Sequence, residues 1–346
     1  MGRVLAPVNG KGAARALVEA GATELYMGFY DAAWTNAFGA QAALNRMSGF
    51  GQDANALSFE ELLAEVQPLL QPSPTVDAAT AAGSTATAAA APDVHAFCVF
   101  NAARYSSEQL DFIAAQYLPR LAEAGFTGVI LSGPQLVEAA HACGLYAVAS
   151  TMCAIYNEDL ARYYRSCGMD RIILPRDVSL GSIGAIMQAV PDLDYEVFLM
   201  RNGCIFADSH CMGLHKADRP ALCRTLRSAA CWNQLGSLAD AGSFDAESFW
   251  ENDRTYKDRF HLNTCGQCAL WRFEQLGVSA YKVVGRCDNL SDLCDDVRLT
   301  AQNVRIAQAC ATEEEFLHAM ERPADLLELC ANEGLSCYYP EPRFGS

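Results

Sequence analysis

Residues 128–175 read GVILSGPQLVEAAHACGLYAVASTMCAIYNEDLARYYRSCGMDRIILP, and this stretch decides the fold. Short apolar runs predict strands at 128–132, 145–151 and 171–175. The segments between them have helical spacing and stop at Gly144 and Gly168, residues that favour the left-handed conformation ending many helices. Short strands alternating with helices predict parallel pairing, with both faces of the sheet covered.

The same unit repeats on both sides of this stretch and predicts a (β/α)8, TIM-like barrel. The expected strands are Arg3–Val8, Glu24–Gly28, Val94–Asn101, Gly128–Ser132, Leu145–Thr151, Arg171–Pro175, Tyr195–Met200 and Ala280–Arg286. A doubly wound open sheet is the alternative. That fold typically carries a G-x-G-x-x-G phosphate-binding motif after its first strand. Pro7–Gly12 lacks that pattern.

The predicted barrel occupies residues 1–314, with a helical tail at 315–346. It carries an Ala- and Thr-rich insertion at 72–92 and a cysteine-rich segment at 201–268. Locally, we expect a Gly- and Ala-rich loop after the second strand. Ser58 and Glu61 form a capping box that opens a helix, and we expect this helix to end near Val66, ahead of Pro68.

Composition and charge narrow the classes of function. The chain has 346 residues and a formal net charge of −16, which disfavours broad nucleic-acid binding. One basic patch, between Arg201 and Arg227, leaves a small anion possible. The N-terminus leads straight into a strand without the features of a signal peptide, and no apolar run is long enough for a membrane span. We therefore expect a cytoplasmic protein.

Cysteines are concentrated in the segment that follows the seventh predicted strand. Of the 15 in the chain, six lie there: Cys204, Cys211, Cys223, Cys231, Cys265 and Cys268. In a reducing compartment, clustered thiols indicate ligands more often than disulfides. Thiolates that converge on one point bind zinc or an iron–sulfur cluster, and a segment without metal is the remaining interpretation.

Polar residues fall where a barrel of this kind has its active site, at the C-terminal ends of the strands. Arg176, Glu196 and Arg286 are candidate catalytic residues, because arginines can clamp a carboxylate or phosphate. The candidate substrate-binding residues are Asn9, Asn101, Asn157 and Arg201. The competing interpretations are ion pairs between strand and loop, and asparagines that only cap turns.

These residues also carry a family resemblance. From Arg3 to about Ala311 the chain resembles the collagenase-like peptidases, peptidase family U32. The matching motifs, in chain order, are Leu5-Ala6-Pro7 with Asn9, Tyr26-Met27-Gly28, Phe100-Asn101, Ala149-Ser150-Thr151, Leu174-Pro175-Arg176-Asp177, Glu196-Val197-Phe198 with Cys204 and Cys211, and Lys282-Val283-Val284-Gly285-Arg286. Val284 replaces the glutamate usual in the family's eighth strand.

The resemblance implies more than proteolysis. Several members look like oxygen-independent hydroxylation proteins that hold a four-cysteine [4Fe–4S] cluster, act on RNA bases or a quinone precursor, and sometimes work with a homologous partner subunit. By motif, Cys204, Cys211 and Cys223 match three ligands. Cys265 and Cys268 compete with Cys231 for the fourth place.

The resulting hypothesis is an iron–sulfur protein that supports hydroxylation, or a related redox modification, of a small anionic substrate or an RNA base. The second hypothesis is a peptidase without a cluster, in which Cys153 or Cys204 approaches a histidine. It has no H-E-x-x-H or G-x-S-x-G motif to support it. The third is a non-catalytic protein whose cysteines bind zinc.

Overall fold

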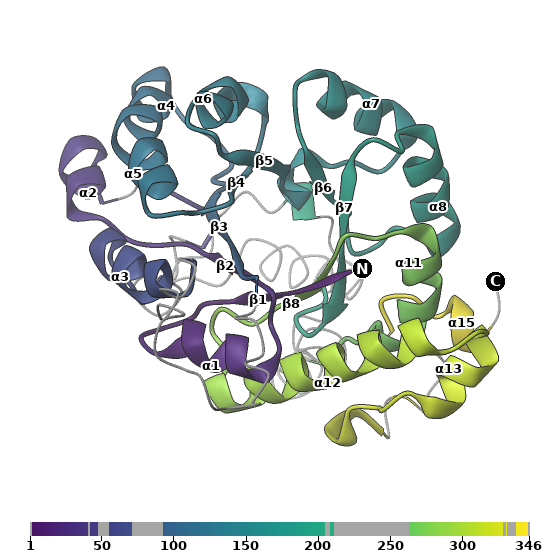
Figure 1. Ribbon diagram of the computed structural model, residues 1–346. Helices are drawn as coiled ribbons and strands as arrows, with labels where there is room; N and C mark the ends of the chain where they lie inside the picture. Colours follow the sequence, from purple (N-terminus) through teal and green to yellow (C-terminus); the bar gives the residue numbers. More distant parts are fainter. Residues whose placement is uncertain are drawn as a thin grey trace, which may run out of the picture.

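The protein is a barrel of eight parallel strands surrounded by helices, as the computed structural model shows (Figure 1). The structure describes residues 2–40, 42–47, 55–70, 93–204, 208–210, 263–327, 330 and 337–344. The predicted (β/α)8 barrel is confirmed. The open doubly wound sheet is wrong, because the first strand pairs with the eighth and closes the ring.

The strands follow one another around the barrel in chain order. They are β1 (Arg3–Pro7), β2 (Glu24–Met27), β3 (His95–Phe100), β4 (Gly128–Leu131), β5 (Tyr146–Ala149), β6 (Arg171–Ile173), β7 (Asp194–Met200) and β8 (Ala280–Val283). Closure places Leu5 beside Lys282, and the β7–β8 pairing shifts register between Phe198 and Met200. The expected strands are thus present, each with slightly different ends.

Helices cover the outside of the barrel. They are α1 (Ala13–Ala20), α2 (Ala32–Phe38), α3 (Phe59–Leu70), α4 (Ser107–Phe112), α5 (Leu118–Glu123), α6 (Val137–Ala142), α7 (Glu158–Ser166), α8 (Leu180–Ala189), α11 (Leu270–Leu276) and α12 (Leu290–Ala309). One π-helical turn, Ile113–Tyr117, joins α4 to α5. Glycine ends several helices as expected. At Gly21, after α1, φ is +113°, and an added Cβ would lie 2.9 Å from the Cβ of Ala301.

Two local predictions are wrong. The expected loop after β2 contains helix α2, whose first turn is capped by Asp31, with Oδ1 accepting from Ala33 N at 3.0 Å. Helix α3 starts with the expected capping box but continues past Val66 to Leu70, with Pro68 inside it. Proline removes only one hydrogen bond there, and Leu69 and Leu70 gain packing against the core.

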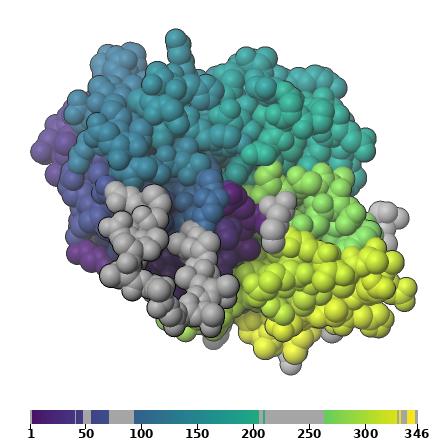
Figure 2. Space-filling model, viewed as in Figure 1, coloured from purple at the N-terminus to yellow at the C-terminus, as the bar shows by residue number. Residues whose placement is uncertain are grey.

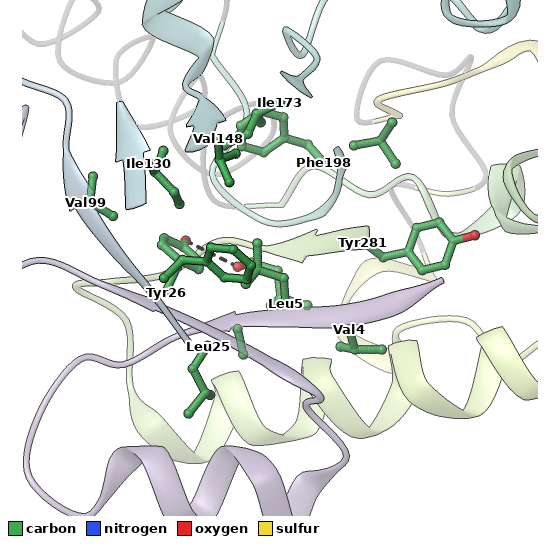
Figure 3. Close-up of a cluster of buried hydrophobic side chains, with 14 of the residues drawn as sticks. Val4, Leu5, Leu25, Tyr26, Val99, Ile130, Val148, Ile173, Phe198 and Tyr281 are labelled. Carbon is green, nitrogen blue, oxygen red and sulfur yellow. Dashed lines mark hydrogen bonds between the residues drawn. The ribbon is translucent and has the colours of Figure 1, made fainter. Parts of the chain in front are cut away.

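Apolar side chains fill one part of the barrel interior. Val99, Ile130, Val148, Ile173 and Phe198 come from the five successive strands β3 to β7 and lie together with Tyr26 (Figure 3). Val4 and Leu25 point the other way, toward the surrounding helices, as the alternation of side chains along a strand requires.

A chain of buried charges fills another part of the interior. Arg171 on β6 donates to both carboxylate oxygens of Glu24 on β2, at 2.6 and 3.0 Å. Its Nη1 also lies 3.8 Å from Glu196 on β7, and Glu196 accepts from Lys282 on β8 at 2.6 Å. The two glutamates are each 1% exposed, so these pairs connect four strands inside the barrel.

The C-terminal residues pack on one side of the barrel. Helix α13 (Glu313–Ala319) and the short helix α15 (Glu341–Phe344) follow α12, and Figure 2 shows these residues in yellow as a lobe against the green residues of the barrel. Arg272 on α11 binds Glu313 through two hydrogen bonds, at 2.6 and 3.1 Å. Within the described part of the chain, none of the helices combines the length and apolar character needed to cross a membrane.

We predict that Arg171→Met lowers the free energy of unfolding by about 3–5 kcal/mol, because it leaves the buried Glu24 without its partner. Arg165→Met is the matched control. Arg165 forms an exposed pair with Asp192, so its loss should cost about 0–1 kcal/mol. Urea denaturation of both variants measures the difference, and equal losses would contradict a structural role for the buried pair.

Candidate functional site

The C-terminal ends of the strands and the loops after them form the barrel mouth, where three arginines gather. Asp208 accepts from Arg46 at 2.8 Å and from Arg176 at 2.9 Å. The Arg176 guanidinium also lies 4.1 Å from the centre of the Phe198 ring. Burial alone would raise the pKa of Asp208, but the two arginines outweigh it and hold the pKa below its usual range. Asp208 is therefore an anion that already has two cationic partners.

Glu196 on β7 and Lys282 on β8 lie inside the barrel, before the strand ends that form the mouth, and they form an ion pair. Lys282 Nζ lies 2.6 Å from Glu196 and 3.9 Å from the centre of the Tyr26 ring. Burial lowers the pKa of Lys282 even though Glu196 opposes the shift. Glu196 was a candidate catalytic residue, and the structure gives its carboxylate a place in the buried ion-pair chain.

Arg286 is different, because no carboxylate in the part of the chain that the structure describes neutralises its charge. Its Nη1 atom is buried and has no hydrogen-bond partner, and no carboxylate in the described ranges pairs with the side chain. Burial lowers the pKa of Arg286 to about 10. A further buried donor at the mouth, Arg176 Nε, also lacks a partner. Unsatisfied buried donors are costly, so this arrangement favours an anionic ligand.

Two asparagines beside Arg286 were not among the predicted site residues. Asn45 and Asn55 are 0% and 3% exposed, and Asn45 Nδ2 donates to Asn55 Oδ1 at 3.1 Å. A Cβ at Gly28 would lie 2.7 Å from Asn45, 2.5 Å from Asn55 and 3.0 Å from Arg286 Nη1. Glycine at the end of β2 is therefore what allows these three side chains to meet. The Tyr-Met-Gly motif was visible in the sequence, but its partners were not.

The four candidate substrate-binding residues have different positions. Asn101 is 7% exposed at the mouth, where it donates to Ser150 Oγ at 3.1 Å and accepts from Arg46 N at 3.1 Å. Asn9 donates to the carbonyl of Asp288 at 2.8 Å. Asn157 caps α7, accepting from Leu160 N at 3.0 Å.

Arg201, the fourth of these residues, forms a bidentate pair with Asp296, with both hydrogen bonds at 2.7 Å. It also binds Asp325 at 2.8 Å. Its φ is +62°, an unusual backbone conformation that this double pairing holds in place. The structure thus brings Asn101, Arg176 and Arg286 together at the mouth, while Asn157 and Arg201 bind parts of the protein itself.

Two of the predicted metal-binding segments run side by side. Cys204 lies four residues beyond β7, within electrostatic range of Arg176 and Tyr338. The segment with Cys265 and Cys268 pairs with the end of β7, since Arg201 N donates to Thr264 O at 2.8 Å and Gly266 N donates to Leu199 O at 2.7 Å. Cys211, Cys223 and Cys231 lie outside the described residues. Within the described ranges, no three potential ligands are arranged to hold one metal ion.

Comparisons with known proteins give a family match. The family model of peptidase family U32 matches residues 81–342, more than half of the chain. Comparison with curated proteins found no match.

Solved structures give distant matches. The U32 peptidase Mk0906 is 12% identical, with 82% of this chain and 93% of that chain covered and a TM-score of 0.47. Thiamine phosphate pyrophosphorylase from Pyrococcus furiosus is 11% identical, with coverage of 87% and 96% and a TM-score of 0.38. A 2,3-dimethylmalate lyase is 13% identical, with coverage of 74% and 93% and a TM-score of 0.34. Identities this low carry no information on the chemistry of the site.

We predict that Arg286→Met leaves the free energy of unfolding unchanged or raises it by about 1–2 kcal/mol, because it removes a desolvated charge that no carboxylate compensates. Arg176→Met is the matched variant at the same mouth. It strips Asp208 of a partner and should destabilise the protein by about 3 kcal/mol. Urea denaturation distinguishes the two, and a large loss in Arg286→Met would mean that its guanidinium is satisfied within the protein.

Proposed function

The chain belongs to peptidase family U32, and on that premise we propose that it binds an iron–sulfur cluster near the barrel mouth. The cluster would support an oxygen-independent hydroxylation, or a related redox modification, of a small anionic substrate. The observation that carries the substrate part is Arg286, whose buried Nη1 has no hydrogen-bond partner and whose side chain pairs with no carboxylate in the described ranges.

Thiols at the edge of the mouth support the cofactor part. Cys204 lies four residues after β7, and the segment that carries Cys265 and Cys268 is hydrogen-bonded to the end of that strand. Cys204, Cys211 and Cys223 are three of the proposed ligands, and the fourth comes from Cys265 or Cys268, with Cys231 as the alternative. Several thiolates are the donor set that an iron–sulfur cluster uses, and the bound cluster would supply electron transfer.

The protein's own side chains would bind and orient the substrate. A carboxylate or phosphate could accept from Arg286 Nη1 and Arg176 Nε, two buried donors at the mouth that lack partners. Asn45, Asn55 and Asn101 lie around that position with further amide groups. The overall charge of −16 favours a small anion over the family's other substrate class, an RNA base within a long polyanion.

The peptidase alternative finds less support. Cys153 donates to the carbonyl of Leu131, and burial raises the pKa of its thiol to about 12, so it is a poor nucleophile. His95 and His141 pair with Asp93 and Asp170, which precede β3 and β6, so both histidines lie at the end of the barrel opposite the mouth. A non-catalytic zinc protein would use the same cysteines. Metal analysis distinguishes it from an iron–sulfur protein.

We predict that anaerobically purified protein contains about four iron and four sulfide per chain. Cys204→Ser and Cys211→Ser should each lose most of this iron, while Cys143→Ser should retain it. Cys143 is half-buried at the end of α6. It precedes the start of β5, so it lies at the end of the barrel opposite the mouth. Iron and sulfide analysis with absorption spectra provides the measurement. A protein without iron after anaerobic reconstitution would refute the cofactor proposal.

We also predict that small carboxylates or phosphates raise the melting temperature of the wild-type protein. A ligand at 100 times its Kd stabilises by about 2.7 kcal/mol, which corresponds to a shift of several degrees. Arg286→Met should lose the shift, and Arg165→Met, on the outer surface, should keep it. An equal shift in all three proteins would show that the anions act elsewhere.

A further inference from the structure

A second group of thiols surrounds a small hollow between the barrel and the C-terminal residues. Four cysteines from two distant parts of the chain line it: Cys265, Cys268, Cys330 and Cys337. Cys204 is not among the lining residues. No pattern in the sequence associates Cys330 and Cys337 with the C-x-x-C, because more than 60 residues separate them from Cys265 and Cys268.

Backbone contacts bring the two pairs together. Cys265 and Cys337 are direct partners in a parallel bridge, and Tyr338 N donates to Cys265 O at 2.9 Å. Between the first two cysteines, a Cβ on Gly266 would lie 2.9 Å from the Tyr339 ring, so glycine permits this close approach.

Gln267 anchors the C-x-x-C to helix α12. It is 0% exposed, donates to Thr300 Oγ1 at 2.7 Å and accepts from Asn303 Nδ2 at 3.0 Å. Both sides of the hollow are therefore fixed by ordinary hydrogen bonds, which do not depend on the thiols themselves.

The thiols have a chemistry suited to a metal ion. Burial raises the pKa of Cys265 and Cys268, and that of Cys337 to about 11, so the free thiols are protonated at neutral pH. Arg343 and Arg322 lie close enough to Cys268 to favour its thiolate. A soft cation that binds the thiols would displace their protons.

Four thiols in a closed site fit zinc or an iron–sulfur cluster. The hollow has a volume of about 10 Å³, about the space of one water molecule. A cluster several ångströms across would require the four side chains to move apart, whereas a single ion requires them only to close inward. The sulfur atoms do not yet surround one point, since no three potential ligands in the described ranges are arranged to hold an ion.

We propose that Cys265, Cys268, Cys330 and Cys337 close around one zinc ion, which fastens the C-terminal residues to the barrel. This site is separate from the iron–sulfur cluster and does not depend on it. It assigns both cysteines of the C-x-x-C to zinc. The cluster ligands of the proposed function then become Cys204, Cys211, Cys223 and Cys231.

The zinc site would also hold a side chain at the barrel mouth. Tyr338, next to Cys337, donates to Arg201 O at 2.5 Å, and its ring centre lies 6.1 Å from that of Phe198. Further on, Glu341 accepts from Leu180 N at 3.0 Å, at the start of α8. Zinc would therefore fix the position of Tyr338 beside Arg176 without touching substrate.

Metal analysis of the full-length protein tests the assignment. We predict about one zinc per chain, lost in Cys268→Ser and Cys330→Ser but retained in Cys204→Ser and in the control Cys143→Ser. Iron should show the opposite pattern, lost in Cys204→Ser and retained in Cys330→Ser. Zinc retained in Cys330→Ser, or iron lost with it, would overturn the proposal. Absence of iron with zinc present would refute only the cluster.

A second measurement uses the wild-type protein alone, so that a misfolded variant cannot imitate the result. The zinc-bound protein and the protein after chelation are alkylated with iodoacetamide and mapped by mass spectrometry. The four cysteines should be protected only while zinc is bound, whereas Cys287, which is exposed, should react in both states. Equal labelling in both states, or a disulfide between Cys265 and Cys337, would contradict a zinc site.

Discussion

Ion pairs buried inside the barrel hold its strands in register. Glu24, Arg171, Glu196 and Lys282 lie on β2, β6, β7 and β8, and each is satisfied only if its partner strand is in the correct register. An isolated buried charge costs several kcal/mol, whereas a slip of one residue would turn these side chains out among the helices. The chain of pairs thus fixes four strands, and the strand ends carry the groups of the mouth.

The same balance of charge explains why the mouth looks like a binding site. Glu196 and Asp208 have cationic partners at short distance, so the barrel satisfies most of its buried ions internally. Arg286 is the exception within the described ranges, and its lowered pKa reflects the cost of keeping it there. Because Arg286 lowers the stability of the protein, its presence is better explained by binding of an anionic ligand than by a role in folding.

Cysteines in the described part of the chain lie in different environments, and each environment favours a different role. Cys98, Cys153 and Cys294 are buried among apolar side chains and act as small hydrophobic residues. Cys204 lies among the charged groups near the mouth, within range of Arg176. Cys265, Cys268, Cys330 and Cys337 share one hollow beside the C-terminal residues. The proposals of a cluster and of a zinc ion rest on these last two environments.

The sequence alone determined the barrel, because alternating strands and helices with glycine stops are local signals repeated along the chain. It also indicated that Arg176, Arg286 and Asn101 lie at one end, since they follow strands whose ends must meet. It failed at α2, where the helix cap supplied by Asp31 was missed, and at Pro68, where packing of Leu69 and Leu70 outweighed local propensity. The folded arrangement was needed to show that Lys282 binds Glu196, that no carboxylate in the described ranges pairs with Arg286, and that Cys330 and Cys265 line one hollow. Those outcomes depend on contacts between residues tens to hundreds of positions apart, which no local pattern encodes.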